Sequence, residues 1–551
     1  MSKVIERIVH TRLYDYCISN NLLTEKNSGL KKSESTTNQL ALITHKISTA
    51  LDNKEDSCLV FLDLSKAFDR VWHSGLLFKL RRLGLSPIII DWFASYLRNR
   101  FQQVVVDGVT SDPVHVTAGV PQGSILGPLF FLIYIDDLAE NLLCLVFLFA
   151  DDTFLLDNFS DPIASSIRVN ADIYTMGNWG AIWKMVFSAV KTKYMVVSKK
   201  PNRVQYPDLT FNGTILERTD TYKHLGLIIN NKFDWNDHIQ STIVKAKKRI
   251  HCINNIKSLL PRRSLCSLYT TMVLPIIEYC DIIYDNCTIR NALDVENVQR
   301  RAALVCTGAY RHTSNDALLA DLGWQPLRIR RQVHKLCLFF KIKNNLTPPY
   351  LRSLIPRDNQ TQYRLRSASN ATLPIPYSRL SSTRNAFVHS TVKLWNTLHL
   401  DVRSAPSLSM FKRRVKLVLF KQHNDKFLPS LYCRMPLGKA SVFLSRLRMG
   451  LSALNFHRFT YNFIPHKSCP NCNYESENIV HFLFQCPTYA APRAVLLESL
   501  SSLIPNEILS ELAVLEQYLI FGSSELPVKT NLEIFSLVSR YLDATGRFDH
   551  N

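Results

Sequence analysis

The sequence of 551 residues predicts an α+β fold with several domains. Two apolar runs, at residues 58–64 and 142–150, have the length of buried strands, and each ends at acidic residues. Apolar residues recur at helical spacing before the first run and again after Tyr222. A hydrophobic content of 46% over this length is enough for more than one core.

Residues 1–55 are expected to form helices, because apolar residues recur every three or four positions at Val4, Ile8, Leu40, Ile43 and Ile47. A polar, basic loop at residues 27–33 separates the two helical stretches. This loop either binds phosphate or is a plain solvated connection.

Two adjacent carboxylates, Asp151 and Asp152, stand between apolar runs at residues 142–150 and 153–156. The pattern predicts a tight β-hairpin whose turn carries both acids. Because neighbouring like charges repel, a divalent cation is their natural partner. A solvated Asp-Asp turn is the alternative, since turns favour Asp.

Another acid, Asp63, lies near the end of the apolar run at residues 58–64. An unpaired carboxylate inside a buried strand is costly, so we expect Asp63 to emerge at a site shared with a metal. The alternative is an Asp that caps the following helix. A loop rich in Gly and Pro at residues 118–128 predicts a turn where the backbone approaches a ligand closely.

The net charge of +21 indicates a polyanionic partner, nucleic acid before membrane. Residues 239–275 contain no acid and predict a surface that grips a nucleic-acid backbone, with a solvated helix face as the alternative. The basic residues of this stretch are Lys245, Lys247, Lys248, Arg249, Lys257, Arg262 and Arg263. No apolar run has the length of a membrane span, so we expect an intracellular protein whose 13 cysteines are mostly reduced.

Near the C-terminus, three cysteines and one histidine have the spacing of metal ligands: Cys469-x2-Cys472-x8-His481-x4-Cys486. This set fits a closed, tetrahedral, structural zinc site. Chance spacing is the alternative.

Five motifs occur in a fixed order: FLDLSKAFD at 61–69, GVPQGSILGP at 119–128, FADD at 149–152, KTK at 191–193 and YKHLGL at 222–227. In this order the chain resembles the reverse transcriptases of non-LTR retrotransposons, most closely jockey-type and related LINE-like elements. The resemblance implies a right-hand polymerase of fingers, palm and thumb with an antiparallel palm sheet. A helical C-terminal region and a small Cys/His zinc module would follow.

The resemblance also implies a division of the chain into six parts. These are partial fingers at 1–57, the palm with the remaining fingers at 58–236, a helical thumb at 237–345, a helical connection at 346–430, the Cys/His zinc-binding module at 431–495 and a helical acidic tail at 496–551.

By the same resemblance, Asp63, Asp151 and Asp152 are catalytic carboxylates that bind Mg²⁺ or Mn²⁺ for a two-metal phosphoryl transfer. Phe68 stands where the family's aromatic gate excludes a 2′-hydroxyl, with a plain core Phe as the alternative. The remaining residues expected at the nucleotide are Leu64, Gln122, Gly123, Lys31 and Lys191.

The implied function is an RNA-directed DNA polymerase that adds deoxynucleotides to a primer 3′-hydroxyl on an RNA template. No endonuclease segment is recognisable, so that activity would come from a separate domain or protein. The chain starts just before the second finger motif, and Lys31 stands where Arg is usual. An inactive, truncated remnant that only binds nucleic acid is therefore the alternative. We expect a ribonucleoprotein in nucleus and cytoplasm.

Overall fold

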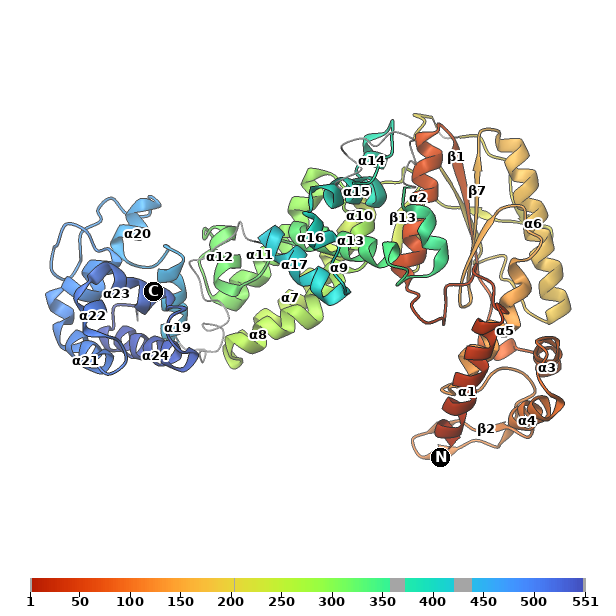
Figure 1. The fold of residues 1–551 in the computed structure, drawn as a ribbon, viewed down its shortest axis with the longest axis horizontal. Coiled ribbons are helices and arrows are strands. Elements are labelled where there is room, and N and C mark those ends of the chain that lie inside the picture. Colours follow the sequence, from red (N-terminus) through yellow and green to blue (C-terminus); the bar gives the residue numbers. More distant parts are fainter. Residues whose placement is uncertain (1, 203, 357–371, 421–438, 549–551) are drawn as a thin grey trace. The chain divides into compact units, whose positions relative to one another are not determined.

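The computed structural model describes residues 2–202, 204–356, 372–420 and 439–548. The chain divides into two compact units (Figure 1). Unit 1 comprises residues 1–238, 282–286 and 335–403, and unit 2 comprises residues 239–281, 287–334 and 404–551. Residues 346–403 of the predicted helical connection thus belong to unit 1. Within the described ranges, no helix is long and apolar enough to cross a membrane.

A five-stranded sheet in the order β11-β8-β1-β7-β6 forms the centre of unit 1. Its neighbouring strands are antiparallel, except that β11 runs parallel to β8. The central strand is buried along its whole length, which explains its uninterrupted run of mostly apolar residues. The strands are β1 (Asp56–Leu62), β6 (Leu145–Phe149), β7 (Asp152–Phe159), β8 (Lys193–Val197) and β11 (Glu217–Arg218).

Both predicted strands and the predicted hairpin are confirmed. The strand expected at residues 142–150 is β6, and it pairs with β7 so that Phe149 faces Asp152 across the turn. The two helices expected before residue 55 are α1 (Ser2–Ser19) and α2 (Thr36–Asp52). The second helix starts at an N-cap, because the Ser35 side chain accepts a hydrogen bond from Asn38 N.

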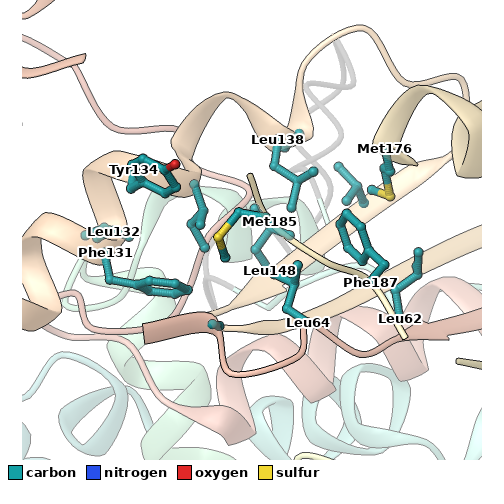
Figure 2. Packing of buried hydrophobic residues seen from close by; sticks show 14 of the residues in the cluster. Leu62, Leu64, Phe131, Leu132, Tyr134, Leu138, Leu148, Met176, Met185 and Phe187 are labelled. Atoms are coloured by element: carbon teal, nitrogen blue, oxygen red, sulfur yellow. The ribbon is translucent and has the colours of Figure 1, made fainter. Parts of the chain in front are cut away.

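Helices cover both faces of the sheet, with α2 on one side and α6 (Pro162–Trp183) on the other (Figure 1). The core on the α6 side also takes in α5 (Leu126–Ile135), an apolar helix that is buried almost throughout. Figure 2 shows side chains gathered there from β1, α5 and α6, among them Leu62, Phe131 and Met176, together with Phe187 of the segment before β8. This core fixes the end of β1, where Asp63 emerges.

Shorter elements complete unit 1. They are α3 (His73–Arg82), α4 (Pro87–Leu97), α14 (Ser381–Arg384), α15 (Phe387–Thr397), α16 (Leu400–Arg403), and the paired strands β2 (Phe101–Gln102) with β5 (Val114–His115), β3 (Val105–Val106) with β4 (Val109–Thr110), β9 (Thr210–Phe211) with β10 (Thr214–Ile215) and β12 (Thr221–His224) with β13 (Leu227–Asn230).

The described part of unit 2 is helical. Its main helices are α8 (Arg262–Leu268), α9 (Leu274–Glu278), α11 (Ile289–Thr307), α12 (Asn315–Leu322), α17 (Leu408–Phe420), α19 (Lys439–Arg448), α20 (Asn455–Thr460), α21 (Ala490–Leu500), α22 (Asn506–Ser510), α23 (Leu512–Phe521) and α24 (Val528–Thr545). Three further helices extend across the unit boundary: α7 (Asn236–Asn255), most of which lies in unit 2, α10 (Asp281–Tyr284) and α13 (Leu327–Lys343).

The predicted zinc module and the predicted acidic tail share one hydrophobic core. Side chains of α19, α21, α23 and α24 pack there with Phe482 and with Cys469 and Cys486 of the Cys/His set. The segment around the cysteines is therefore supported by helices that follow it in the sequence.

A buried ionic cluster joins three helices of unit 2. Asp321 of α12 pairs with Arg262 of α8 and, at 2.9 Å from Nε to Oδ1, with Arg448 of α19. Ser445 also donates to Asp321 Oδ2, at 2.9 Å. The expectation that Arg262 contacts nucleic acid is therefore wrong, because its guanidinium is buried and already paired.

We predict that Asp321→Ala destabilises unit 2 by about 3–5 kcal/mol, because it leaves two buried guanidinium groups without a counter-charge. Hydrogen exchange of the full chain should show lost protection in α8, α12 and α19. Asp316→Ala, at an exposed acid of the same helix, is the control and should cost far less. Equal effects of the two substitutions would contradict this assignment.

Candidate active site

The register of β1 and β7 brings Asp63 and Asp152 to the same edge of the sheet. Leu62 and Thr153 form the last pair of the antiparallel ladder between β1 and β7. Asp63 follows Leu62 and Asp152 precedes Thr153, so both acids lie at this end of the ladder. Asp151 follows Ala150 in the tight turn, where Ala150 adopts a positive φ of 55°. The three predicted carboxylates are thus gathered at one site.

The negative charge at this edge is incompletely neutralised. Burial, together with the nearby charges of Asp151 and Asp63, raises the pKa of Asp152. Burial and the charges of Asp152 and Asp63 also raise the pKa of Tyr222. Asp63 Oδ2 is buried and accepts no hydrogen bond from the residues that the structure describes. Such a set of oxygens has the chemistry of a site for a hard divalent cation.

Lys191 is the basic side chain beside the aspartates. Its Nζ lies 3.6 Å from Asp63 Oδ2 and is largely exposed. Lys193, the second lysine of the same KTK motif, points elsewhere, since its Nζ pairs with Glu217 Oε1 at 2.8 Å. The geometry therefore places Lys191, the lysine expected at the nucleotide, beside Asp63 and places Lys193 elsewhere.

The segment before β8 holds the residues around Asp63 in place. Ser188 N donates to Asp63 O at 2.9 Å, and Ser65 N donates to Val186 O at 2.8 Å. Leu64 is buried and forms an isolated β-bridge with Phe187. These bonds extend the ladder past the end of β1 and fix the backbone at the site.

The basic loop at residues 27–33 packs against the hairpin that carries the acids. Ser28 N donates to Leu148 O at 2.8 Å, and Leu148 N donates to Lys26 O at 2.9 Å. A Cβ added at Gly29 would lie 2.0 Å from Ala150 N, so only glycine allows this approach. The loop is therefore part of the site's framework and not a plain solvated connection.

Lys31 lies in this loop but does not reach the aspartates. Its Nζ donates to the carbonyl of Thr24, and burial lowers the pKa of its ammonium group. A contact that the sequence did not suggest lies nearby, where Tyr350 OH donates to Glu34 Oε2 at 2.7 Å. Burial raises the pKa of Glu34 to about 7. Because these residues are 316 positions apart, no local pattern could have shown the pair.

The loop rich in Gly and Pro docks on the segment that contains Phe68. Val120 N donates to Phe68 O at 2.9 Å, and the Phe68 ring stacks on Phe131 with 4.2 Å between centroids. Gln122 and Gly123 are exposed. The positive φ of 76° at Gly123 strains any residue with a side chain, although an added Cβ would meet no atom within 4 Å.

In unit 2, α7 is an amphipathic helix. Its buried face carries Ile239, Ile243, Ala246, Ile250 and Ile253. Its exposed face carries Lys245, Lys247, Lys248 and Arg249, and Arg263 is exposed at the start of α8. Apart from the buried Arg262, the basic residues predicted here are therefore available to a polyanion.

The Cys/His set comes together as its spacing predicts. The ligand atoms of Cys469, Cys472, His481 and Cys486 lie within 4.8 Å of one another. Cys469 Sγ is 3.9 Å and Cys472 Sγ 3.8 Å from Cys486 Sγ. Thiolates bound about 2.3 Å from one tetrahedral ion stand about 3.8 Å apart, so these distances fit zinc.

A second group with ligand atoms this close is formed by Glu278, Asp281 and His334 of unit 2. Its carboxylates already have partners within the protein, because Arg330 binds both Glu278 oxygens and His334 Nδ1 lies 2.7 Å from Asp281 Oδ2. The three aspartates of unit 1 are not among the groups within 4.8 Å in the described residues, so their oxygens spread more widely than a single-ion cage.

Residues 1–229 match the family described as reverse transcriptase (RNA-dependent DNA polymerase). This part of the chain, which contains the sheet and the aspartates, is a reverse transcriptase domain. It is of the non-LTR, LINE-like type, which confirms the resemblance that the motifs indicate.

Two relatives from fruit flies support this assignment. The probable RNA-directed DNA polymerase from transposon BS of Drosophila melanogaster is 28% identical over 334 residues, covering 59% of this chain and 37% of the relative. The RNA-directed DNA polymerase from mobile element jockey of Drosophila funebris is 29% identical over 353 residues, covering 61% of this chain and 38% of the relative. The matched region thus spans well under half of either relative.

Among solved structures, apo telomerase from Candida tropicalis aligns with a TM-score of 0.35 at 12% identity, covering 55% of this chain and 50% of that chain. This similarity is too low to define a common architecture.

We predict about one equivalent of zinc per purified chain, and much less after Cys472→Ser, because a tetrahedral structural site needs all four ligands. Cys472 is the least buried of the three cysteine ligands, so its substitution disturbs packing least. Metal analysis after dialysis provides the measurement, with Cys252→Ser at an exposed cysteine of the same unit as control. Zinc content unaltered by Cys472→Ser would rule out the site.

Proposed function

We propose that this protein is an RNA-directed DNA polymerase that extends a primer with deoxynucleotides. The gathering of Asp63, Asp151 and Asp152 at one edge of the sheet, within a reverse transcriptase domain, carries the proposal. In polymerases, carboxylates from a strand end and a neighbouring turn serve phosphoryl transfer with two metal ions.

The three aspartates would hold Mg²⁺ or Mn²⁺. Asp63 Oδ2 is buried and accepts no hydrogen bond from the described residues, although Lys191 Nζ lies 3.6 Å away. This oxygen and the raised pKa of Asp152, caused by burial and by its two acidic neighbours, support a cation at this position. When bound, such ions lower the pKa of a primer 3′-hydroxyl and neutralise charge on the leaving pyrophosphate.

Lys191 would contribute positive charge at the triphosphate. Its exposed ammonium group stands 3.6 Å from Asp63 Oδ2, at the position where the phosphates must approach the aspartates. There it can bind a phosphate oxygen or donate a proton to the leaving group. Lys31 is a weaker candidate, since its ammonium group is turned toward Thr24.

Phe68 would select deoxynucleotides by steric exclusion of a 2′-hydroxyl. Its ring is only partly buried and is held by the stack on Phe131, so it does not yield readily to an additional oxygen. Gln122 and Gly123, exposed on the loop that docks beside Phe68, would contact the same nucleotide.

The exposed cations of α7, together with Arg263, would bind the phosphates of an RNA template and DNA primer independently of sequence. In this proposal, the sheet of unit 1 is the palm of a right-hand polymerase and α7 lies in its thumb. The Cys/His set would bind Zn²⁺ as a structural module, and a separate endonuclease domain or protein would nick the target.

Primer extension on an RNA template with Mg²⁺ tests the proposed function directly. We predict that Asp151→Asn lowers the rate by about a thousandfold, equivalent to roughly 4 kcal/mol at the transition state, since an amide cannot supply the negative charge. RNA affinity should stay within about twofold of wild type, because the affinity comes from basic residues elsewhere.

Asp107→Asn is a matched control, because Asp107 is an exposed residue with a positive φ of 50° that Asn also adopts readily. Its extension rate should equal that of wild type. If Asp151→Asn abolished RNA binding and synthesis together, the acids would have a structural role and not a catalytic one.

Phe68→Ala should admit ribonucleotides, because it removes the ring that would fill the space of the 2′-hydroxyl. We expect the preference for deoxynucleotides to fall by about a hundredfold, measured as the ratio of kcat/KM values for the two sugars. Phe78→Ala, at an exposed phenylalanine, is the control. An unchanged ratio in the presence of normal deoxynucleotide incorporation would remove Phe68 from this role.

A further inference from the structure

Asp69 and Gln122 connect two loops beside the candidate active site. Gln122 Nε2 donates a hydrogen bond to Asp69 Oδ1 at 2.9 Å. Asp69 immediately follows Phe68, and Gln122 lies in the loop rich in Gly and Pro. Both side chains are exposed, so the pair is accessible to a bound molecule and is not part of the core.

The backbones of these loops are fixed by other contacts. Gly119 N donates to Val71 O at 2.9 Å, and His73 Nε2 lies within hydrogen-bond distance of Gly119 O, at 2.8 Å. A Cβ added at Gly119 would lie 2.9 Å from Asp69 Cα, so the two segments touch without a side chain between them. These contacts fix the backbone without the hydrogen bond between Asp69 and Gln122. That hydrogen bond therefore serves to orient the Gln122 side chain.

The carboxylate of Asp69 determines which end of the Gln122 amide faces outward. A carboxylate only accepts hydrogen bonds, so the amide must turn its NH₂ group toward Asp69. Gln122 Oε1 is then directed away from Asp69 and is available as an acceptor. An amide without this partner could rotate and present a donor instead.

We propose that Asp69 is a positioning residue, which holds Gln122 so that Oε1 accepts a hydrogen bond from an O–H or N–H group of the incoming deoxynucleoside triphosphate. This inference rests on the proposed polymerase function. Asp69 acts through Gln122 and does not itself touch the substrate. Because it follows Phe68 directly, the same segment sets both the sugar gate and the amide orientation.

Steady-state primer extension separates this role from catalysis. Asp69→Ala should raise the KM for deoxynucleotides about tenfold, equivalent to about 1.4 kcal/mol, with kcat changed less than about twofold. Asp69→Asn should raise the KM less than Asp69→Ala, because its side-chain carbonyl can still accept from Gln122 Nε2, whereas its NH₂ group also allows the reversed amide.

A reciprocal exchange tests the hydrogen bond itself. Gln122→Glu sets two carboxylates against each other and should raise the KM, since like charges at this distance repel. Adding Asp69→Asn to Gln122→Glu restores one donor and one acceptor and should lower the KM again. A residue that only supports folding would not produce this recovery.

Asp220→Ala is the matched control, because Asp220 Oδ1 accepts from Asn231 Nδ2 at 2.8 Å in an exposed pair of the same unit. Its KM should equal that of wild type. A wild-type chain that fails to extend primers would overturn the proposed function and this inference with it. An active wild type with an unchanged KM after Asp69→Ala, or without recovery in the double variant, would overturn the positioning role alone.

Discussion

The constraint on which the structure of unit 1 depends is the close approach of three carboxylates, whose negative charge the exposed ammonium group of Lys191 offsets only in part. Two unit charges about 4 Å apart repel by about 4 kcal/mol at the effective dielectric of a protein surface. The raised pKa of Asp152, due to burial and to Asp151 and Asp63, reflects this repulsion. Hydrophobic burial of the strands opposes this repulsion. Because β1 is entirely buried, its register with β7 is fixed, and this register holds Asp63 and Asp152 at the same edge of the sheet. The basic loop at residues 27–33 adds a second restraint through Gly29, which fits closely against the turn.

Local patterns in the sequence were sufficient to predict those parts of the site that are formed by neighbouring segments of the chain. The apolar runs on either side of Asp151 specify a hairpin, and strand pairing then places Asp63 at the same edge. The Cys/His set is predictable for the same reason, since its four ligands lie within 18 residues of sequence. Contacts between distant segments leave no such pattern. One example is the hydrogen bond from Tyr350 to Glu34. Another is Arg262, which was predicted to be exposed because its stretch contains no acid but is buried and paired with Asp321 outside that stretch.

The same distinction applies to the C-terminal helices, whose acidic composition suggested a separate tail. In the structure they support the Cys/His segment. Arg547 pairs with the buried Glu477 between Cys472 and His481, at 2.7 Å from Nε to Oε1, and Tyr541 OH donates to Phe482 O at 2.7 Å. A carboxylate that is buried in this segment needs such a counter-charge. Loss of the last helix would therefore affect the Cys/His segment, although none of the four predicted ligands lies in that helix.

The distribution of charge separates the binding of nucleic acid from the chemistry proposed for the aspartates. Cations in the interior are paired, as Lys79 is with Asp137 and Arg448 with Asp321, so they contribute nothing to the attraction of a polyanion. Among the described residues, exposed cations such as those of α7 are therefore the groups available to a polyanion. Phosphate contacts at exposed cations weaken as salt screens them, over a Debye length of about 10 Å at 0.1 M. The aspartates have the opposite requirement, since a triphosphate can approach them only when cations offset their charge. Ionic strength thus chiefly changes the affinity of the basic surface for phosphates, whereas divalent cations change how readily a triphosphate approaches the aspartates at the edge of the sheet.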